Sequence, residues 1–385
     1  MSEWKEYRLD ECTEIKNGKS RPKNIGIVPV YGGNGIFDYC NNSNVSGQTI
    51  IIGRVGAYCG SVYFENNEIW VSDNALFAKS KPGFDSKYLY YLLTHDNLNQ
   101  YAGGSSHPLL TQSRLNELKY SIPNFRTQTA IAEILSSLDD KIELNNKINQ
   151  ELENLAQTLF KQWFIDFEFP NENGEPYKSS GGEMVESELG EIPKGWSFGT
   201  LKDEFNLNMG QSPKGDTYNE TGDGMIFFQG RSDFGFRYPS VRMFTKDPKK
   251  VAKKFETLIS VRAPVGDINM VEYDCCIGRG LGSISHSRKL FSYTYYKILS
   301  IQEELKSYDN EGTVFGSINK ETLGNIKTII PPLTISCGFD DLVKGKDQLI
   351  YNLTNQNQQL TNLRDTLLPK LISGELEVSQ INTTS

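Results

Sequence analysis

A long internal repeat constrains the fold of this chain more than any local motif. When the sequence is shifted by 208 residues, segment 49–54 aligns with 257–262. Near the start, Trp4 aligns instead with Trp196, an offset of 192, so the second copy carries about 16 additional residues in its front part. A repeat of this length indicates two similar modules in one polypeptide rather than a solenoid of short units. Two like modules are expected to perform the same kind of task at two places.

The chain carries a net charge of −8 over 385 residues, but its acids are concentrated between the modules. Segment 165–192 holds eight carboxylates and one lysine, whereas residues 1–126 and 193–333 are nearly balanced. Balanced modules can bind a polyanion through a local patch, although their charge alone would not hold DNA strongly. A DNA ligand would therefore need a partner to supply part of the phosphate contact.

Hydropathy and the spacing of the cysteines argue against a membrane span, a signal peptide and a disulfide or zinc framework. No apolar run is long enough to span a bilayer, and the first residues lack the pattern of a signal peptide. The six cysteines form no Cys-x-x-Cys pair and lie far in sequence from the three histidines. We expect reduced cysteines in a cytoplasmic protein, without a disulfide or zinc framework.

The first module is rich in Gly, Asn, Tyr, Val and Ile, which predicts a mixed α/β domain with irregular loops. Strands are expected at 48–55 and 60–64. Short helices are expected at 87–93 and 111–118, the second with Thr111 as its N-cap.

Two leucine-rich stretches follow the modules. Residues 127–164 contain neither proline nor glycine, and their apolar positions keep a heptad-like spacing that 334–378 repeats in the same phase. Each predicts a long amphipathic helix, and packing the two together would bury both apolar stripes. Lys141 and Asn145 interrupt the first stripe, where a polar residue can set the register. The expected seam consists of Ile131, Ile134, Leu138, Ile142, Ile148, Leu152, Leu155 and Leu159, with Leu342, Leu349, Leu353, Leu360, Leu363 and Leu367.

An ordered set of motifs carries a resemblance to one family. Segment 136–145, running on to 155–164, and segment 363–376 resemble the conserved helices of the specificity (S) subunits of type I restriction–modification enzymes. The segments typical of that family's target-recognition domains are 31–36, 54–56, 210–213, 262–267 and 277–281. Each motif alone is weak, but together they cover nearly the whole chain in the expected order.

The resemblance implies a fold of class α+β: two similar mixed α/β target-recognition domains separated by a long antiparallel two-helix coiled coil, with pseudo-two-fold symmetry. Each domain would read one half of a bipartite double-stranded DNA sequence. Two modification (methyltransferase) subunits would dock on the helices and domains, and restriction (translocase–nuclease) subunits can join. The implied boundaries are 1–126 and 195–333 for the domains, 127–164 and 334–378 for the central and distal helices, 165–194 for an acidic linker and 379–385 for a tail.

In that family the S subunit has no catalytic site, and the residues argue independently against catalysis. The Asn/Asp-Pro-Pro-aromatic loop that an amino-methyltransferase uses to hold a flipped base does not occur. Neither does a Gly-x-x-x-x-Gly-Lys-Ser/Thr phosphate loop. The glycines at 278, 280 and 282 lack the strand–helix context of a nucleotide-binding loop. We expect no catalytic residue, no cofactor and no metal.

Base edges are read by Arg, Lys, Asn, Gln, Ser and Thr, and phosphates are held by Lys and Arg. Glycine-containing loops that carry these residues can approach a groove closely, although ordinary surface loops have the same composition. Arg54 and Arg262, equivalent under the repeat, could clamp phosphates or form structural salt bridges. The basic run 246–254 could bind phosphate or be a solvated face. The candidate DNA-binding residues are Lys19, Arg21, Gly33, Asn34, Arg54, His107, Gln211, Lys214, Gln229, Arg231, Lys249, Lys250 and Arg262.

The two modules differ in local sequence, so the two half-sites should differ and the target should be asymmetric. A coiled-coil interaction scaffold without DNA readout is the alternative function, which the acidic total favours slightly. A self-contained restriction–modification enzyme is a third, against which the missing motifs argue. The candidate partner-binding residues on the helices are Ile142, Leu152, Leu159, Phe160, Leu349, Leu360 and Leu367.

Overall fold

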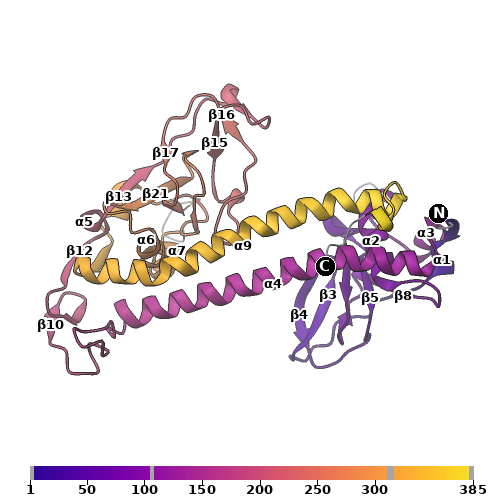
Figure 1. Ribbon diagram of the computed structural model, residues 1–385, viewed down its shortest axis with the longest axis horizontal. Helices are drawn as coiled ribbons and strands as arrows, with labels where there is room; N and C mark the ends of the chain where they lie inside the picture. Colours follow the sequence, from indigo (N-terminus) through magenta and orange to yellow (C-terminus); the bar gives the residue numbers. More distant parts are fainter. Residues whose placement is uncertain (1–3, 105–107, 310–315, 381–385) are drawn as a thin grey trace. The chain divides into compact units, whose positions relative to one another are not determined.

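The computed structural model describes residues 4–104, 108–309 and 316–380 (Figure 1). Its contacts divide the chain into two compact units: unit 1 comprises Met1–Asn146 and Thr354–Ser385, and unit 2 comprises Lys147–Leu353. Each unit therefore contains one globular domain and one segment of each long helix, α4 (Phe125–Phe164) and α9 (Leu333–Ser373). Both helices form within about two residues of the expected start.

The globular domain of unit 1, domain 1, is built on a four-stranded antiparallel sheet of order β2-β8-β5-β6. Its central strand β5 is a run of isoleucines buried on both faces. A second sheet pairs β3 with β4 in a hairpin and with β7 in parallel. The bounds are β1 (Lys5–Arg8), α1 (Leu9–Cys12), β2 (Thr13–Asn17), β3 (Val28–Gly32), β4 (Gly35–Cys40), β5 (Thr49–Gly53), β6 (Val62–Glu65), β7 (Trp70–Val71), β8 (Ala75–Ser80), α2 (Ser86–His95), α3 (Gln112–Asn116) and β9 (Lys119–Ile122).

The domain of unit 2, domain 2, repeats this plan with a sheet of order β13-β21-β18-β19 and a parallel pair β15–β20. Strand β13 lies 192 residues after β2, and β18 lies 208 after β5, which confirms the repeat and puts the additional residues between these strands. The bounds are β12 (Ser197–Thr200), α5 (Leu201–Glu204), β13 (Phe205–Met209), β14 (Tyr218–Asn219), β15 (Met225–Phe228), β16 (Phe244–Thr245), β17 (Val251–Ala252), β18 (Thr257–Ser260), β19 (Ile268–Met270), β20 (Cys275–Ile277), β21 (Leu281–His286), α6 (Phe291–Ser300), α7 (Gln302–Ser307), α8 (Lys320–Gly324) and β22 (Lys327–Ile330).

The local expectations for domain 1 are confirmed. Strands β5 and β6 and helices α2 and α3 occupy the four expected segments. The Thr111 side chain caps α3 by accepting a hydrogen bond from the backbone N–H of Arg114 at 3.4 Å. Asp85 caps α2 in the same way through Tyr88.

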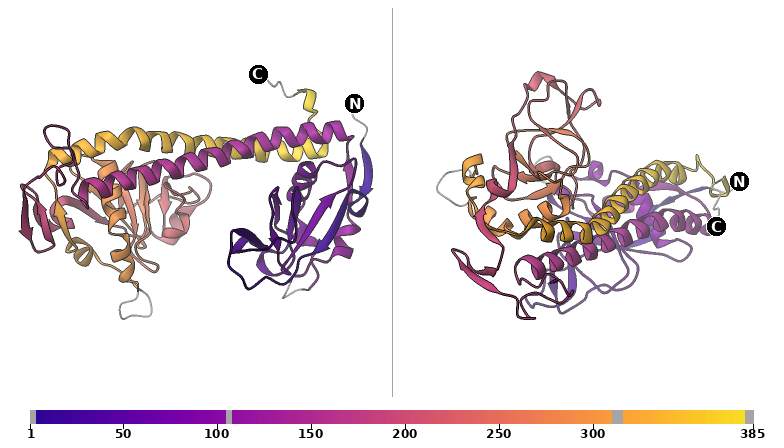
Figure 2. Two further views of the ribbon diagram at one scale, coloured as in Figure 1. Left: turned by 90° about the horizontal axis from the view of Figure 1, so that it is seen from below. Right: turned by 60° about the vertical axis from the view of Figure 1, so that its left-hand side comes forward.

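Within each unit the two helix segments run antiparallel, as Figure 2 also shows. In unit 1, Asp139 pairs with Arg364 and Asn145 pairs with Gln356. Residue numbers therefore increase along α4 where they decrease along the facing part of α9. In unit 2, the ring of Phe160 lies 5.5 Å from that of Phe339, measured between centroids. The expected antiparallel pairing is therefore present in both units.

The expected seam is wrong in phase in unit 2. Leu155, Leu342 and Leu349 remain 46%, 44% and 42% exposed, while the next residue in each case, Ala156, Val343 and Ile350, is fully buried. Leu363 in unit 1 is likewise 47% exposed. The helices in unit 2 bury a face that serves both the partner helix and the globular domain, so the leucine stripe turns outward.

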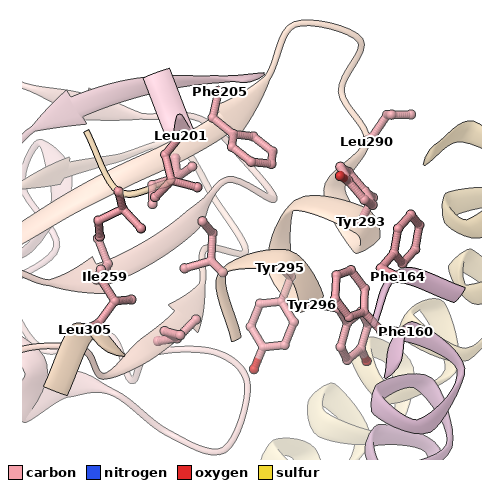
Figure 3. Close-up of a cluster of buried hydrophobic side chains, with 14 of the residues drawn as sticks. Phe160, Phe164, Leu201, Phe205, Ile259, Leu290, Tyr293, Tyr295, Tyr296 and Leu305 are labelled. Carbon is pink, nitrogen blue, oxygen red and sulfur yellow. The ribbon is translucent and has the colours of Figure 1, made fainter. Parts of the chain in front are cut away.

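That shared face is an aromatic cluster (Figure 3), in which Phe160 and Phe164 of α4 pack against Tyr293 and Tyr296 of α6. Phe160 is only 3% exposed, so its side chain fills the core of unit 2. The expectation that Phe160 contacts a partner subunit is corrected here, because the domain's own tyrosines cover it. The other expected partner residues, Ile142, Leu152, Leu159, Leu360 and Leu367, are half-buried.

The acidic segment expected to be a linker is ordered. Phe167 and Phe169 are buried beside Trp196, and β10 (Met184–Ser187) pairs with β11 (Gly190–Pro193). Three buried aromatic residues thus anchor a segment that composition alone marks as loose. The chain reverses through a packed hairpin rather than a flexible tether.

Candidate nucleic-acid interface

In domain 1, several glycine loops meet around the turn Ser72-Asp73-Asn74, here called turn 1. A Cβ on Gly18 would clash with the carbonyl oxygen of Ser72, so only glycine allows the chain after β2 to pass this close. The Lys19 N–H donates to the carbonyl of Val71 at 3.0 Å, immediately before the turn. The Arg54 N–H donates to Asn74 at 3.0 Å.

The loop at Gly33 and Asn34 belongs to the same constellation. A Cβ on Gly33 would lie 3.7 Å from the carbonyl oxygen of Asn74 and 3.5 Å from that of Val55. The Asn34 side chain is exposed. The structure therefore brings the loops of Lys19, Gly33, Asn34 and Arg54 together on one side of domain 1.

Two neighbours of these loops have structural roles. Tyr31 is buried and donates from its hydroxyl to Glu65 at 3.1 Å; burial, with the Glu65 charge, raises the pKa of this phenol. Arg21 forms an ion pair with Asp38 of β4. This ion pair partly neutralises the charge of the Arg21 guanidinium. The remaining candidate of domain 1, His107, lies outside the described residues.

Domain 2 builds the same arrangement around the turn Gly278-Arg279-Gly280, here called turn 2. A Cβ on Gly210 would clash with the carbonyl oxygen of Gly278, as one on Gly18 would with that of Ser72. The Gln211 N–H donates to the carbonyl of Ile277 at 2.9 Å, the counterpart of the Lys19 contact. The Gln211 side chain is exposed.

The loop at Gln229 and Arg231 also meets turn 2. Positions for a Cβ on Gly278 and Gly280 lie 3.0 Å and 2.9 Å from Gln229 backbone atoms, so the turn packs directly on this loop. Arg231 pairs with Asp267 at 2.6 Å, and both side chains remain partly exposed. The loops of Gln211, Gln229 and Arg231 thus meet at turn 2, and Lys214 lies exposed three residues beyond Gln211.

The basic run 246–254 is less available than its sequence implies. Lys246, Lys249 and Lys253 each pair with an aspartate. The Lys250 side chain is exposed and has no ion-pair partner among the described residues. Its backbone carbonyl accepts a hydrogen bond from the Ile277 N–H at 2.9 Å, which places Lys250 beside turn 2. Lys250 is therefore better placed than Lys249 to meet a phosphate.

The matched arginines differ in exposure. Arg54 is half-buried and its Nε lacks a hydrogen-bond partner, whereas Arg262 is exposed at the end of β18. In the part of the chain that the structure describes, neither forms an ion pair, and Arg262 is the more accessible of the two. Sequence reasoning missed Asp73 and Arg279, the exposed central residues of the two turns.

Other kinds of site have little support in the described ranges. No three His, Cys, Asp or Glu side chains gather there as metal ligands. No helix among the described residues has the length and hydrophobicity to cross a membrane. All six cysteines are free thiols, and five are buried.

Comparison with known proteins agrees with this fold and site. The model of the type I restriction modification DNA specificity domain matches residues 1–154 and 193–361. A Methanocaldococcus jannaschii protein, provisionally named the type I restriction enzyme MjaX specificity subunit, is 32% identical over 85% of this chain and 76% of its own length. The type I restriction enzyme HindI specificity subunit of Haemophilus influenzae is 26% identical over 98% of this chain and its full length.

A solved structure shares the fold. The S subunit of a type I restriction–modification system from M. genitalium superposes with a TM-score of 0.64, at 19% identity, over 96% of each chain. Two domains, each with glycine loops packed around a turn, together with two long helices define a DNA-specificity protein. This chain belongs to the family of type I restriction–modification specificity subunits, which are non-catalytic components of those systems.

Proposed function

We propose that this chain reads an asymmetric, bipartite double-stranded DNA sequence, with domain 1 selecting one half-site and domain 2 the other. The observation that carries the proposal is the constellation of glycine-supported loops, built twice on equivalent strands but bearing different side chains. Equivalent loops with different polar groups suit two different half-sites, because sequence is read by the donors and acceptors that reach base edges.

We further propose that modification subunits dock on the helices and that restriction subunits join the same assembly. Support comes from the outward leucines, above all Leu342 and Leu349 on α9 and Leu155 on α4, which leave apolar surface uncovered. The repetition of the helix–domain unit supports one modification subunit for each unit. Such subunits would also supply phosphate contacts that a chain of net charge −8 makes sparingly.

The test is selection from a random duplex library by the chain assembled with its modification subunits, followed by sequencing and by methylome mapping in cells. The expected result is one motif with two unlike half-sites separated by a fixed gap. A single contiguous motif would contradict the one-domain-per-half reading. Binding without any sequence preference would favour the interaction scaffold instead.

A further inference from the structure

Turn 1 and turn 2 are structurally equivalent, although sequence alignment at the main offset does not pair them. The N–H of Ser72 donates to Tyr31 of β3 at 2.8 Å, and the N–H of Gly278 donates to Phe228 of β15 at 2.8 Å. Each turn then closes with the same bond: Ala75 to Ser72 and Leu281 to Gly278, both at 3.0 Å.

The central residues of the two turns have opposite charges. Asp73 occupies this position in domain 1 and Arg279 occupies it in domain 2, and both are exposed. In the described parts of the chain, neither side chain has an ion-pair or hydrogen-bond partner. Each charge is therefore available to a ligand.

The backbones beneath these side chains are fixed. The Arg279 N–H donates to the hydroxyl of Ser212 at 3.1 Å, and the flanking glycines pack on Gln229 with no room for larger residues. On the other side, buried Ser72 accepts at its hydroxyl from the Asn74 N–H at 3.4 Å. A supported turn with one free charged side chain presents that group in a defined direction, as base readout requires.

We propose that Arg279 and Asp73 are equivalent base-reading residues of opposite preference: Arg279 selects guanine in one half-site, and Asp73 selects cytosine at the corresponding place in the other. This rests on the proposed function and names residues that determine its specificity. A guanidinium donates two hydrogen bonds to the O6 and N7 acceptors of guanine, whereas a carboxylate accepts from the N4 amino group of cytosine. A carboxylate facing phosphates would be repelled, so Asp73 suits a DNA-facing turn only where a base amino group meets it.

The test maps the methylated motif in cells that express the full chain with its modification subunits. Arg279→Asp should abolish the guanine preference at one position of one half-site and leave the other half unchanged. Asp73→Arg should do the same to one cytosine in the other half. Each change should cost roughly ten- to hundredfold in discrimination at that base pair, the range for one good base contact.

Arg279→Ala separates base choice from affinity, and Arg288→Asp, an exposed position beyond the opposite end of β21, is the matched control with an unchanged motif. Relaxation of one guanine by Arg279→Ala supports the proposal. An unchanged motif in both Arg279 variants overturns it, as does loss of all methylation by assembled Arg279→Ala. A wild-type chain that directs methylation to no motif would instead refute the proposed function.

Discussion

Asn145 of α4 is fully buried and donates from its side-chain amide to the Gln356 side chain of α9 at 2.8 Å. The same amide donates to Asn357 at 2.8 Å, and Asn357 donates in turn to Asn146 at 2.8 Å. This polar layer lies in the helix pair of unit 1. It can form in only one alignment of the two helices, because any slip would leave the buried amide of Asn145 without its partners.

Replacing Asn145 by alanine should lower the free energy of unfolding of unit 1 by about 1–3 kcal/mol, because two hydrogen bonds between the helices are lost, each contributing about 0.5–1.5 kcal/mol. Hydrogen exchange along the α4 segment of unit 1 would measure this loss. Glu133→Ala, at an exposed position of α4 within unit 1, should change stability by less than about 0.5 kcal/mol. Equal effects of the two variants would show that the polar layer contributes nothing specific.

A buried arginine joins domain 2 to both helices of unit 2. Arg237 has no exposed surface, pairs with Glu153 of α4 and with Asp347 of α9, and stacks 3.9 Å from the ring centroid of Tyr295. Arg237→Leu should destabilise unit 2 by about 3–5 kcal/mol, since it leaves the carboxylates of buried Glu153 and largely buried Asp347 without their cation. Denaturant unfolding would measure the change, with Arg288→Ala as a control near zero, because Arg288 is exposed and has no ion-pair partner among the described residues.

A triple variant tests whether unpaired charge or lost packing causes this loss of stability. Replacing Arg237, Glu153 and Asp347 together by apolar residues should recover most of the lost stability, because no charge is then left uncompensated. If the triple variant were as unstable as Arg237→Leu, the single effect would reflect lost packing rather than unpaired charge.

Asp340 of α9 should make the stability of unit 2 depend on pH. It is 9% exposed and accepts from the Tyr293 N–H of α6 at 3.0 Å. Burial, and then the nearby charge of Asp347, raise the pKa of this carboxyl above its usual value of 3.8. The folded state thus prefers the protonated form, so stability should fall as pH rises from 3.8 through the raised pKa.

Asp340→Asn keeps an acceptor for Tyr293 but cannot ionise. The variant should match the wild type below pH 4 and exceed it in stability at neutral pH, as measured by denaturant unfolding across that range. A stability advantage of Asp340→Asn that is independent of pH would mean that ionisation of Asp340 is not the cause.

Individual strands and both long helices follow from patterns that depend on few residues at a time, whereas the order of the strands in the sheets was not predicted. The isoleucine run of β5 and the leucines of α4 each specify their element locally. The repeat then predicts the equivalent elements in the second half of the chain. The phase of the helix seam could not be predicted in this way. Heptad reasoning gives each helix one partner, whereas Phe160 must also meet Tyr293 of the globular domain.

The candidate site was likewise predictable only in part. Loops at Lys19 and Gln211 were predictable, because glycines and polar residues mark them in sequence. Asp73 and Arg279 were not paired in the sequence, because β21 begins 24 residues after β18 whereas β8 begins 26 residues after β5, which changes the offset from 208 to 206. Arg237 carries no sequence signal for burial, since only the folded unit brings Glu153 and Asp347 to it.

The outward leucines of α9 should matter for assembly and not for folding. Leu342 and Leu349 lie seven residues apart on one face and are more than two-fifths exposed. The variant Leu342→Ser/Leu349→Ser should therefore leave the unfolding midpoint nearly unchanged but weaken binding of the modification subunit at least tenfold, measured by co-purification and titration. Asn352→Ser, an exposed polar position on α9, should bind normally; equal binding by all three proteins would place the docking surface elsewhere.

Lys249 and Lys250 are adjacent in sequence but should contribute differently to DNA binding. Lys249 is held by Asp247 at 2.7 Å, so meeting a phosphate would require that pair to break. Lys250 is exposed beside turn 2 and has no ion-pair partner in the described ranges. Each phosphate contact contributes about one unit to the slope of log affinity against log salt concentration. Lys250→Ala should therefore reduce that slope by about one, uniformly across DNA sequences, and Lys249→Ala by clearly less. Equal slopes for the two variants, measured on the assembled complex, would show that the Asp247 pair does not withhold Lys249 from DNA.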